Sequence, residues 1–151
     1  MIALACDHHG IALKEELKKM LEDMGLEWKD FGTYDVNSQD DYPVYGYRAA
    51  KAVVDRECDR GILLCGTGMG ISIAAGKVKG IRVCTCSDVY SAEMSKRHNN
   101  SNILTMGALV VGTEKAKMIA RAWLTAEFEG GRHQRRIDMI TRIENGEAPE
   151  A

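Results

Sequence analysis

Short runs of apolar residues alternate along this chain with segments of helical periodicity. The clearest run is Gly61-Ile62-Leu63-Leu64-Cys65, which contains no charged residue and ends in the glycine-rich segment 66–70. Further strand candidates are Ile2 to Cys6, Leu26 to Phe31, Ile81 to Cys86 and Ile103 to Met106. Largely apolar strands separated by helices are typical of a parallel sheet that helices cover on both faces. We therefore predict a single-domain, doubly wound α/β fold of the Rossmann-like class with a five-stranded parallel sheet.

The segments between these strands predict the helices. Leu13, Leu17 and Leu21 recur at helical spacing, and Gly25 is the expected end of that helix. Other helices are expected over Pro43 to about Arg56, Ile71 to Ala75, Val89 to Arg97, Glu114 to Phe128 and Arg132 to Glu144. Gly130-Gly131 is expected to let the last helix swing away from the body. The domain is expected to span residues 1–145, with a short tail at 146–151.

The composition narrows the choice of partner and compartment. A net charge of −2 argues against nucleic acid or an anionic membrane as the main partner. No apolar run approaches the roughly 20 residues of a membrane span, and the N-terminal residues resemble no signal peptide. Five cysteines without a secretion signal indicate reduced thiols and a cytoplasmic location. Cys84 and Cys86 are expected to point to opposite faces of a strand end, and no cysteine–histidine spacing predicts a zinc site.

Polar residues follow three of the predicted strands. Asp7-His8-His9 follows the first strand, Cys65-Gly66-Thr67 the third and Ser87-Asp88 the fourth. Because ligands of open α/β sheets bind at the carboxyl ends of the strands, these clusters are expected to meet at one edge. If the chain turns at Asp7-His8, His9 is expected to face solvent.

The segment Cys65 to Gly70 joins a buried strand to a helix. Its glycines leave backbone N–H groups free to face an anion, and the helix N-terminus adds partial positive charge. The segment lacks the lysine of a Walker A loop and does not follow the first strand, as a dinucleotide fingerprint would. A thiol in this place loses its proton more readily, so Cys65 is a candidate nucleophile or base, although many cysteines are simply small buried hydrophobes. A tyrosine phosphatase loop would need arginine where Ile71 stands.

Two further groups each allow two interpretations. His98 follows a helix, where a histidine commonly interacts as a cation with the helix dipole. Arg132 and Arg136 lie one helical turn apart on the same face. A pair of guanidinium groups suits a phosphate dianion, but such a pair also fits an ordinary solvated face.

Several motifs occur together in an order that is characteristic of one enzyme family. These motifs are Asp7-His8-x-Gly10, Asp30-Phe31-Gly32-Thr33, Tyr42-Pro43, Cys65 to Ala75, Arg97-His98-Asn99 and Glu129 to Arg136. The chain resembles the ribose-5-phosphate isomerase B family, whose relatives act on galactose 6-phosphate and allose 6-phosphate. The resemblance implies a homodimer or a dimer of dimers with shared active sites, in which the C-terminal helix reaches a partner subunit.

The resemblance also implies a role for each motif in an aldose–ketose isomerase without metal or organic cofactor. Cys65 would remove the C2 proton of a phosphorylated sugar. The groups that would stabilise the enediolate are Thr67 and the backbone amides of Gly66, Gly68, Met69 and Gly70. Asp7 and His98 would open the sugar ring. The residues that would bind the substrate are His8, Tyr42 and Asn99 on the sugar and Arg132 and Arg136 on the phosphate.

Two positions depart from the pattern of this family. Many members carry an arginine that binds phosphate where this chain has Leu109, and an asparagine where it has Gly76. The leading prediction is interconversion of D-ribose 5-phosphate and D-ribulose 5-phosphate, and the alternative is the same chemistry on allose 6-phosphate or galactose 6-phosphate. An alternative of another class is a flavodoxin-like module that binds flavin or a nucleotide through the same glycine-rich segment. That alternative gives Cys65 and the two arginines no role.

Overall fold

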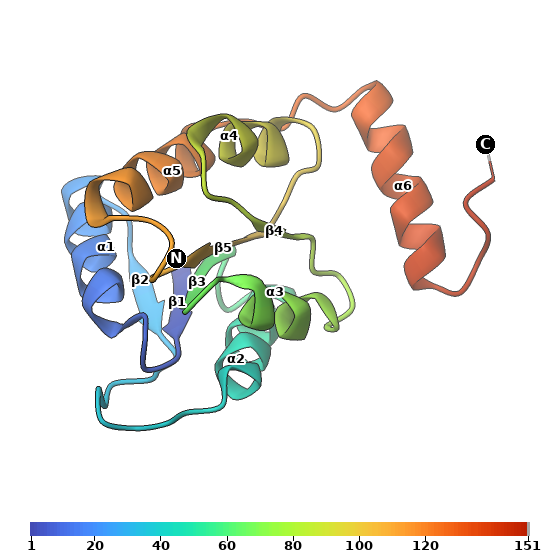
Figure 1. Cartoon of the computed structure of the whole chain (residues 1–151). Coiled ribbons are helices and arrows are strands. Elements are labelled where there is room, and N and C mark those ends of the chain that lie inside the picture. The colour runs from blue at the N-terminus through green and yellow to red at the C-terminus, as the bar shows by residue number, and fades with distance from the viewer. Residues whose placement is uncertain (151) are drawn as a thin grey trace.

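A single parallel sheet organises the chain, whose computed structural model describes residues 1–150 (Figure 1). Its strands are β1 (Ile2–Cys6), β2 (Trp28–Asp30), β3 (Arg60–Cys65), β4 (Val83–Thr85) and β5 (Ile103–Gly107). Their order in the sheet is β2-β1-β3-β5-β4, and every neighbouring pair is parallel. The predicted five-stranded, doubly wound α/β fold is confirmed.

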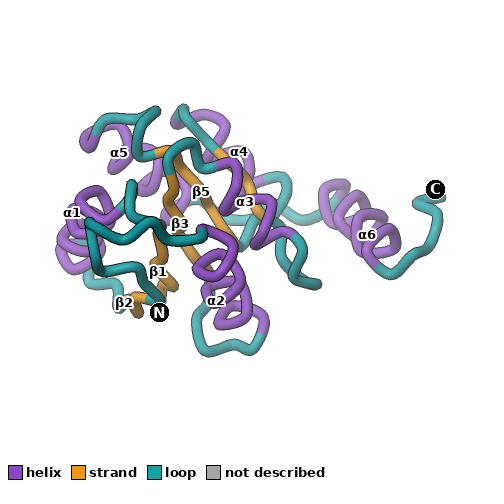
Figure 2. The backbone as a smooth tube through the Cα atoms, turned by 60° about the horizontal axis from the view of Figure 1, so that its bottom comes forward, coloured by secondary structure: helices purple, strands orange, loops and turns teal. Residues whose placement is uncertain are grey.

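Helices cover both faces of this sheet, as Figure 2 also shows. The helices are α1 (Ile11–Asp23), α2 (Tyr42–Val54), α3 (Met69–Gly76), α4 (Val89–Arg97), α5 (Thr113–Thr125) and α6 (Arg132–Glu144). Helices α1, α4 and α5 pack against one face, and α2 and α3 pack against the other. No helix in residues 1–150 combines the length and the apolar character that a bilayer crossing requires.

Side-chain alternation along the strands divides the core into two layers. In β3, Ile62 and Leu64 pack with α1 and α5, whereas Leu63 and Cys65 pack with α2 and α3. Successive strand residues point to opposite faces, so a strand that is apolar throughout contributes to both layers. Both layers therefore depend on β3, and Cys65 lies at the end of the layer beneath α3.

The two outer strands are shorter than the sequence predicts. Leu26 donates its N–H to Leu21 O and belongs to the turn that ends α1, so β2 begins only at Trp28. Ile81 likewise belongs to a turn closed by Val78 O, and β4 begins only at Val83. Edge strands have one hydrogen-bonded neighbour, so turns on either side readily shorten them.

The expectation for the cysteine pair beside β4 is wrong in one respect. Cys84 and Cys86 both pack against the same core layer, because residues two apart in a strand share a face. They do not form a disulfide, and all five cysteines are free thiols.

Helix α6 projects beyond the sheet, away from the other helices (Figure 1). The preceding Gly130-Gly131 has φ values of 68° and 57°, and these left-handed conformations redirect the chain. Only His133 and Ile137 of this helix are buried. Ile140 and Ile143 remain about half exposed. The swing of the last helix is confirmed, whereas the boundary of the domain at residue 145 stays a prediction.

A buried ion pair ties α1 to the end of β2. Lys14 is 1% exposed, and its Nζ donates to Asp30 Oδ1 at 2.8 Å and to Thr33 O at 2.7 Å. Lys18 Nζ lies 2.7 Å from the other carboxylate oxygen of Asp30. The carboxylate therefore pairs with two ammonium groups, and one of these, on Lys14, is almost completely shielded from water.

Replacing Asp30 with alanine should destabilise the fold strongly, because Lys14 would remain buried without its carboxylate. We expect the free energy of unfolding to fall by about 3 kcal/mol or more in urea denaturation. The matched control is Asp55→Ala, which removes an exposed i,i+4 pair with Lys51 and should cost less than about 1 kcal/mol. Equal losses in the two variants would contradict the importance of the buried pair.

Candidate active site

Parallel pairing places three strand ends in one row. Cys6 pairs with Leu64, and Cys65 pairs with Gly107, so β1, β3 and β5 end at the same edge of the sheet. Asp7 directly follows β1, and the glycine-rich segment directly follows β3. We call this place the carboxyl edge. The expected meeting of Asp7 and Cys65 at one edge is confirmed.

The backbone after β3 turns toward the thiol of Cys65. Gly68 adopts φ +79°, and its N–H donates to Cys65 Sγ at 3.2 Å. A Cβ atom on Gly68 would lie 2.8 Å from the Met106 carbonyl carbon, so only glycine fits here. The N–H of Met69 donates to Thr67 Oγ1 at 3.2 Å and opens α3. The sulfur of Cys65 therefore faces a backbone N–H at the N-terminus of a helix.

The other four cysteines lie in different surroundings. Burial raises the pKa of Cys6 to about 11 and that of Cys86 to about 12. Burial also raises the pKa of Cys58 and of Cys84. These thiols stay protonated at neutral pH and serve as small apolar groups in the core. Cys65 differs from these four in that its Sγ accepts a backbone N–H at the start of a helix.

Asp7 organises the segment after β1. Its carboxylate is 5% exposed, accepts the His9 N–H at 3.0 Å and lies 3.4 Å from His9 Nδ1. The rings of His8 and His9 lie side by side, with their centroids 4.0 Å apart. His8 Nδ1 is buried and has no hydrogen-bond partner among the described residues. The chain turns at this point, so neighbouring side chains reach the same edge.

Tyr42 and Thr67 complete the carboxyl edge. The ring of Tyr42 lies against Gly70, where a Cβ atom would come within 2.6 Å of it, so no larger residue fits at position 70. Next to the segment is a hollow of about 280 Å³. Its lining includes Thr67, Met69 and Gly107. The sequence-predicted residues Asp7, His8, Tyr42, Cys65 and Thr67 are thus brought to one edge.

His98 and Asn99 lie at the opposite edge. They follow α4, and Arg82, just before β4, donates to Asn99 O at 3.1 Å. The ring of His98 stacks on that of His133 at 4.2 Å, and His98 Nε2 lies 3.4 Å from Glu129 Oε2. Burial and the neighbouring His98 lower the pKa of His133, which disfavours its protonation. We call His98, Glu129 and His133 the histidine cluster.

The two arginines of α6 lie beside this cluster. Arg132 directly precedes His133 in the chain, and Arg132 and Arg136 are both exposed. Neither guanidinium forms an ion pair within residues 1–150. Both are therefore free to receive an anion from outside the chain.

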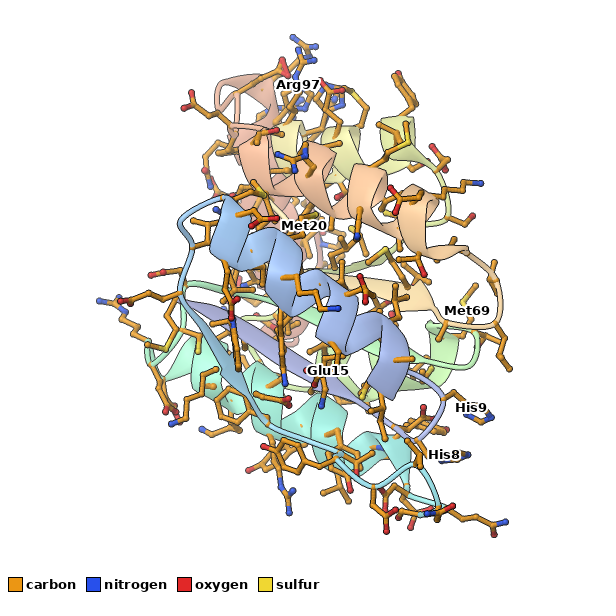
Figure 3. The ribbon with its side chains drawn as sticks, turned by 90° about the vertical axis from the view of Figure 1, so that its left-hand side faces the viewer. His8, His9, Glu15, Met20, Met69 and Arg97 are labelled. Atoms are coloured by element: carbon orange, nitrogen blue, oxygen red, sulfur yellow. The ribbon has the colours of Figure 1, made fainter. Side chains whose placement is uncertain are left out.

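One chain does not bring the two groups of residues together. A strand rises about 3.3 Å per residue, so the length of β5 alone separates the carboxyl edge from the histidine cluster by more than about 13 Å. Figure 3 shows His8, His9 and Met69 at one end of the molecule and Arg97, next to His98, at the other. The predicted site is divided between opposite edges of the sheet.

Two residues at the carboxyl edge were not predicted as part of the site. Asp40 lies near His8, and a hydrogen bond from Ser38 lowers the pKa of its carboxyl group. His9 was expected in solvent and is exposed, yet its ring also lies beside Gly66. Asp40 lies in an irregular loop, where no periodicity in the sequence marks it as a site residue. His9 had such a mark, because it belongs to the Asp7-His8-His9 run.

Comparisons with known proteins show the family of the chain. The ribose/galactose isomerase family model matches residues 2–140. Ribose-5-phosphate isomerase B of Escherichia coli is 52% identical over 95% of each chain. D-erythrulose-4-phosphate isomerase of Pectobacterium atrosepticum is 42% identical over 97% of this chain and 96% of its own.

Solved structures show the same fold. Ribose-5-phosphate isomerase B of Clostridium thermocellum superposes with a TM-score of 0.93 at 50% identity, over 96% of this chain and 97% of its own. The Mycoplasma genitalium enzyme, solved with bound ribulose 5-phosphate, gives a TM-score of 0.91 at 37% identity over 95% of each chain. The chain belongs to the ribose/galactose isomerase family of sugar-phosphate isomerases.

Proposed function

We propose that this protein interconverts D-ribose 5-phosphate and D-ribulose 5-phosphate, with Cys65 as the base. The observation that carries the proposal is the hydrogen bond from the Gly68 N–H to Cys65 Sγ at the start of α3. Relatives of up to 52% identity that are named ribose-5-phosphate isomerase B support the choice of sugar.

The reaction moves two protons and leaves the carbon skeleton intact. The Cys65 thiolate takes the proton from C2 of the open-chain aldose, and negative charge develops on O1. The hydroxyl proton of O2 passes to O1, and the thiol returns its proton to C1 as the ketone forms at C2. Backbone N–H groups of the segment 66–70 and Thr67 stabilise the enediolate. Asp7 assists the opening of the sugar ring.

We propose further that two chains form each active site. The carboxyl edge supplies the base, whereas His98, Asn99 and the α6 arginines belong to the opposite edge. A two-fold dimer places the carboxyl edge of one chain against the histidine cluster of the other, twice over. The projecting α6, with Ile140 and Ile143 exposed, is suited to reach across such an interface. Arg132 and Arg136 would then bind the phosphate and orient the reacting carbons.

We place the enzyme in the cytoplasm, where thiols stay reduced. Support comes from the five free cysteines, among them a base that disulfide formation would disable.

Replacing Cys65 with alanine should abolish isomerisation while the fold is kept. We expect a loss of at least about a thousandfold in kcat, because no other group at this edge takes the C2 proton. The measurement is turnover of ribose 5-phosphate without added metal, with circular dichroism as the test of folding. The matched control is Cys58→Ala, which removes a buried thiol remote from the substrate and should retain turnover.

Turnover that survives Cys65→Ala would refute the assigned base and keep the reaction. A wild-type enzyme that is inactive on ribose 5-phosphate would refute the proposed sugar. Allose 6-phosphate, galactose 6-phosphate and D-erythrulose 4-phosphate would then be tested in turn.

Mixed dimers test the division of the site. Cys65→Ala and His98→Asn chains should each be inactive alone, because every site lacks one of the two groups. After the two are mixed and refolded, half of the dimers contain both chains, and each of these has one intact site. We expect about a quarter of wild-type activity per chain.

Two different affinity tags allow the mixed dimers to be isolated. If these dimers are inactive, Cys65 and His98 act in the same site of one chain. The Cys58→Ala chain, mixed with His98→Asn in the same way, checks that refolding itself preserves activity.

A further inference from the structure

The carboxyl edge lacks an evident cation for the substrate. Asp7 is acidic, and Tyr42, Cys65 and Thr67 add no positive charge. Lys14 is buried behind this edge and already paired with Asp30. Among the residues assigned above to this edge, those that can carry positive charge are the imidazoles of His8 and His9.

His9 is held in place on one side only. Asp7 accepts its backbone N–H at 3.0 Å and lies 3.4 Å from its Nδ1, while the ring packs beside that of His8. His9 Nε2 has no hydrogen-bond partner among residues 1–150, and the side chain is 40% exposed. The carboxylate holds the ring through Nδ1 and leaves Nε2 facing outward, where a cationic imidazole donates its Nε2–H to a second anion.

The ring of His9 also lies directly beside the segment that follows Cys65. A Cβ atom on Gly66 would lie 3.7 Å from His9 Nδ1 and 3.5 Å from Leu109 Cδ1. His9 and Leu109 therefore flank the same point, next to the proposed base. Leu109 is 73% exposed and carries no charge, so the two residues form an open patch with a single polar group.

We propose that His9 is a ligand of the substrate phosphate and sets the affinity of this enzyme for phosphorylated sugars. The inference rests on the proposed isomerase function and extends it to a residue of the carboxyl edge. Asp7 holds the imidazolium at Nδ1, and Nε2–H donates to a phosphate oxygen. The arginines proposed to come from the partner subunit would bind the remaining oxygens.

The test compares His9→Val with wild type in three measurements: KM and kcat for ribose 5-phosphate, and competitive inhibition by inorganic phosphate. Loss of one charge-assisted hydrogen bond should raise KM and the phosphate Ki together by about tenfold, with kcat within about twofold. Adding Leu109→Arg to His9→Val should recover most of the lost phosphate affinity, because the new cation reaches the same point. The matched control is Leu109→Gln in the His9→Val chain, which adds a polar side chain without charge and should not restore it.

Unchanged KM and Ki in His9→Val would overturn the proposal. A raised KM with an unchanged phosphate Ki would overturn it in favour of a contact with a sugar hydroxyl. Equal rescue by Leu109→Gln and Leu109→Arg would overturn the role of charge. Calorimetric titration with inorganic phosphate measures phosphate binding by His9 even if the wild type does not isomerise ribose 5-phosphate. A failure of the proposed reaction can therefore be told apart from a failure of His9 to bind phosphate.

Discussion

Parallel hydrogen bonding of β3 to β1 and β5 is the constraint on which the rest of the structure depends. This register ends three strands in one row and leaves Asp7, the glycine-rich segment and Gly107 as neighbours. It also divides the apolar residues of β3 between two core layers, so the strand that carries Cys65 is held from both faces. The thiol of Cys65, at the end of such a strand, cannot move far from the Gly68 N–H, and this rigidity suits the proposed reaction, which relies on positioning.

The central parts of the fold were predictable because their sequence signals are unambiguous. The uncharged run before Cys65 can bury all of its side chains only as a central strand of a sheet that helices cover on both faces. Helices α4 and α6 have the predicted bounds, and their starts are marked by Asp88, which caps α4, and by the paired glycines before α6. The carboxyl edge followed from topology, because parallel strands deliver their final residues to one side.

Other features depend on contacts that a single sequence does not reveal. Turns closed by backbone hydrogen bonds shorten β2 and β4, and no residue pattern marks where such a turn ends. Asp40 reaches His8 from an irregular loop, where neither spacing nor periodicity indicates proximity. The separation of His98 from Cys65 follows from the direction of α4, which returns the chain to the amino ends of the strands. Motifs that occur in order along a chain can thus belong to sites at opposite edges.

The projecting helix α6 has a consequence for how activity depends on the amount of protein. In the proposed dimer, a newly made chain is complete as a fold but holds only half of each site. Catalytic capacity would then grow with the square of chain concentration below the dissociation constant and linearly above it. A dilute preparation would lose activity without unfolding, and concentrating it would restore activity. The strength of a subunit contact, rather than the stability of the domain, would set the lowest useful concentration of this enzyme.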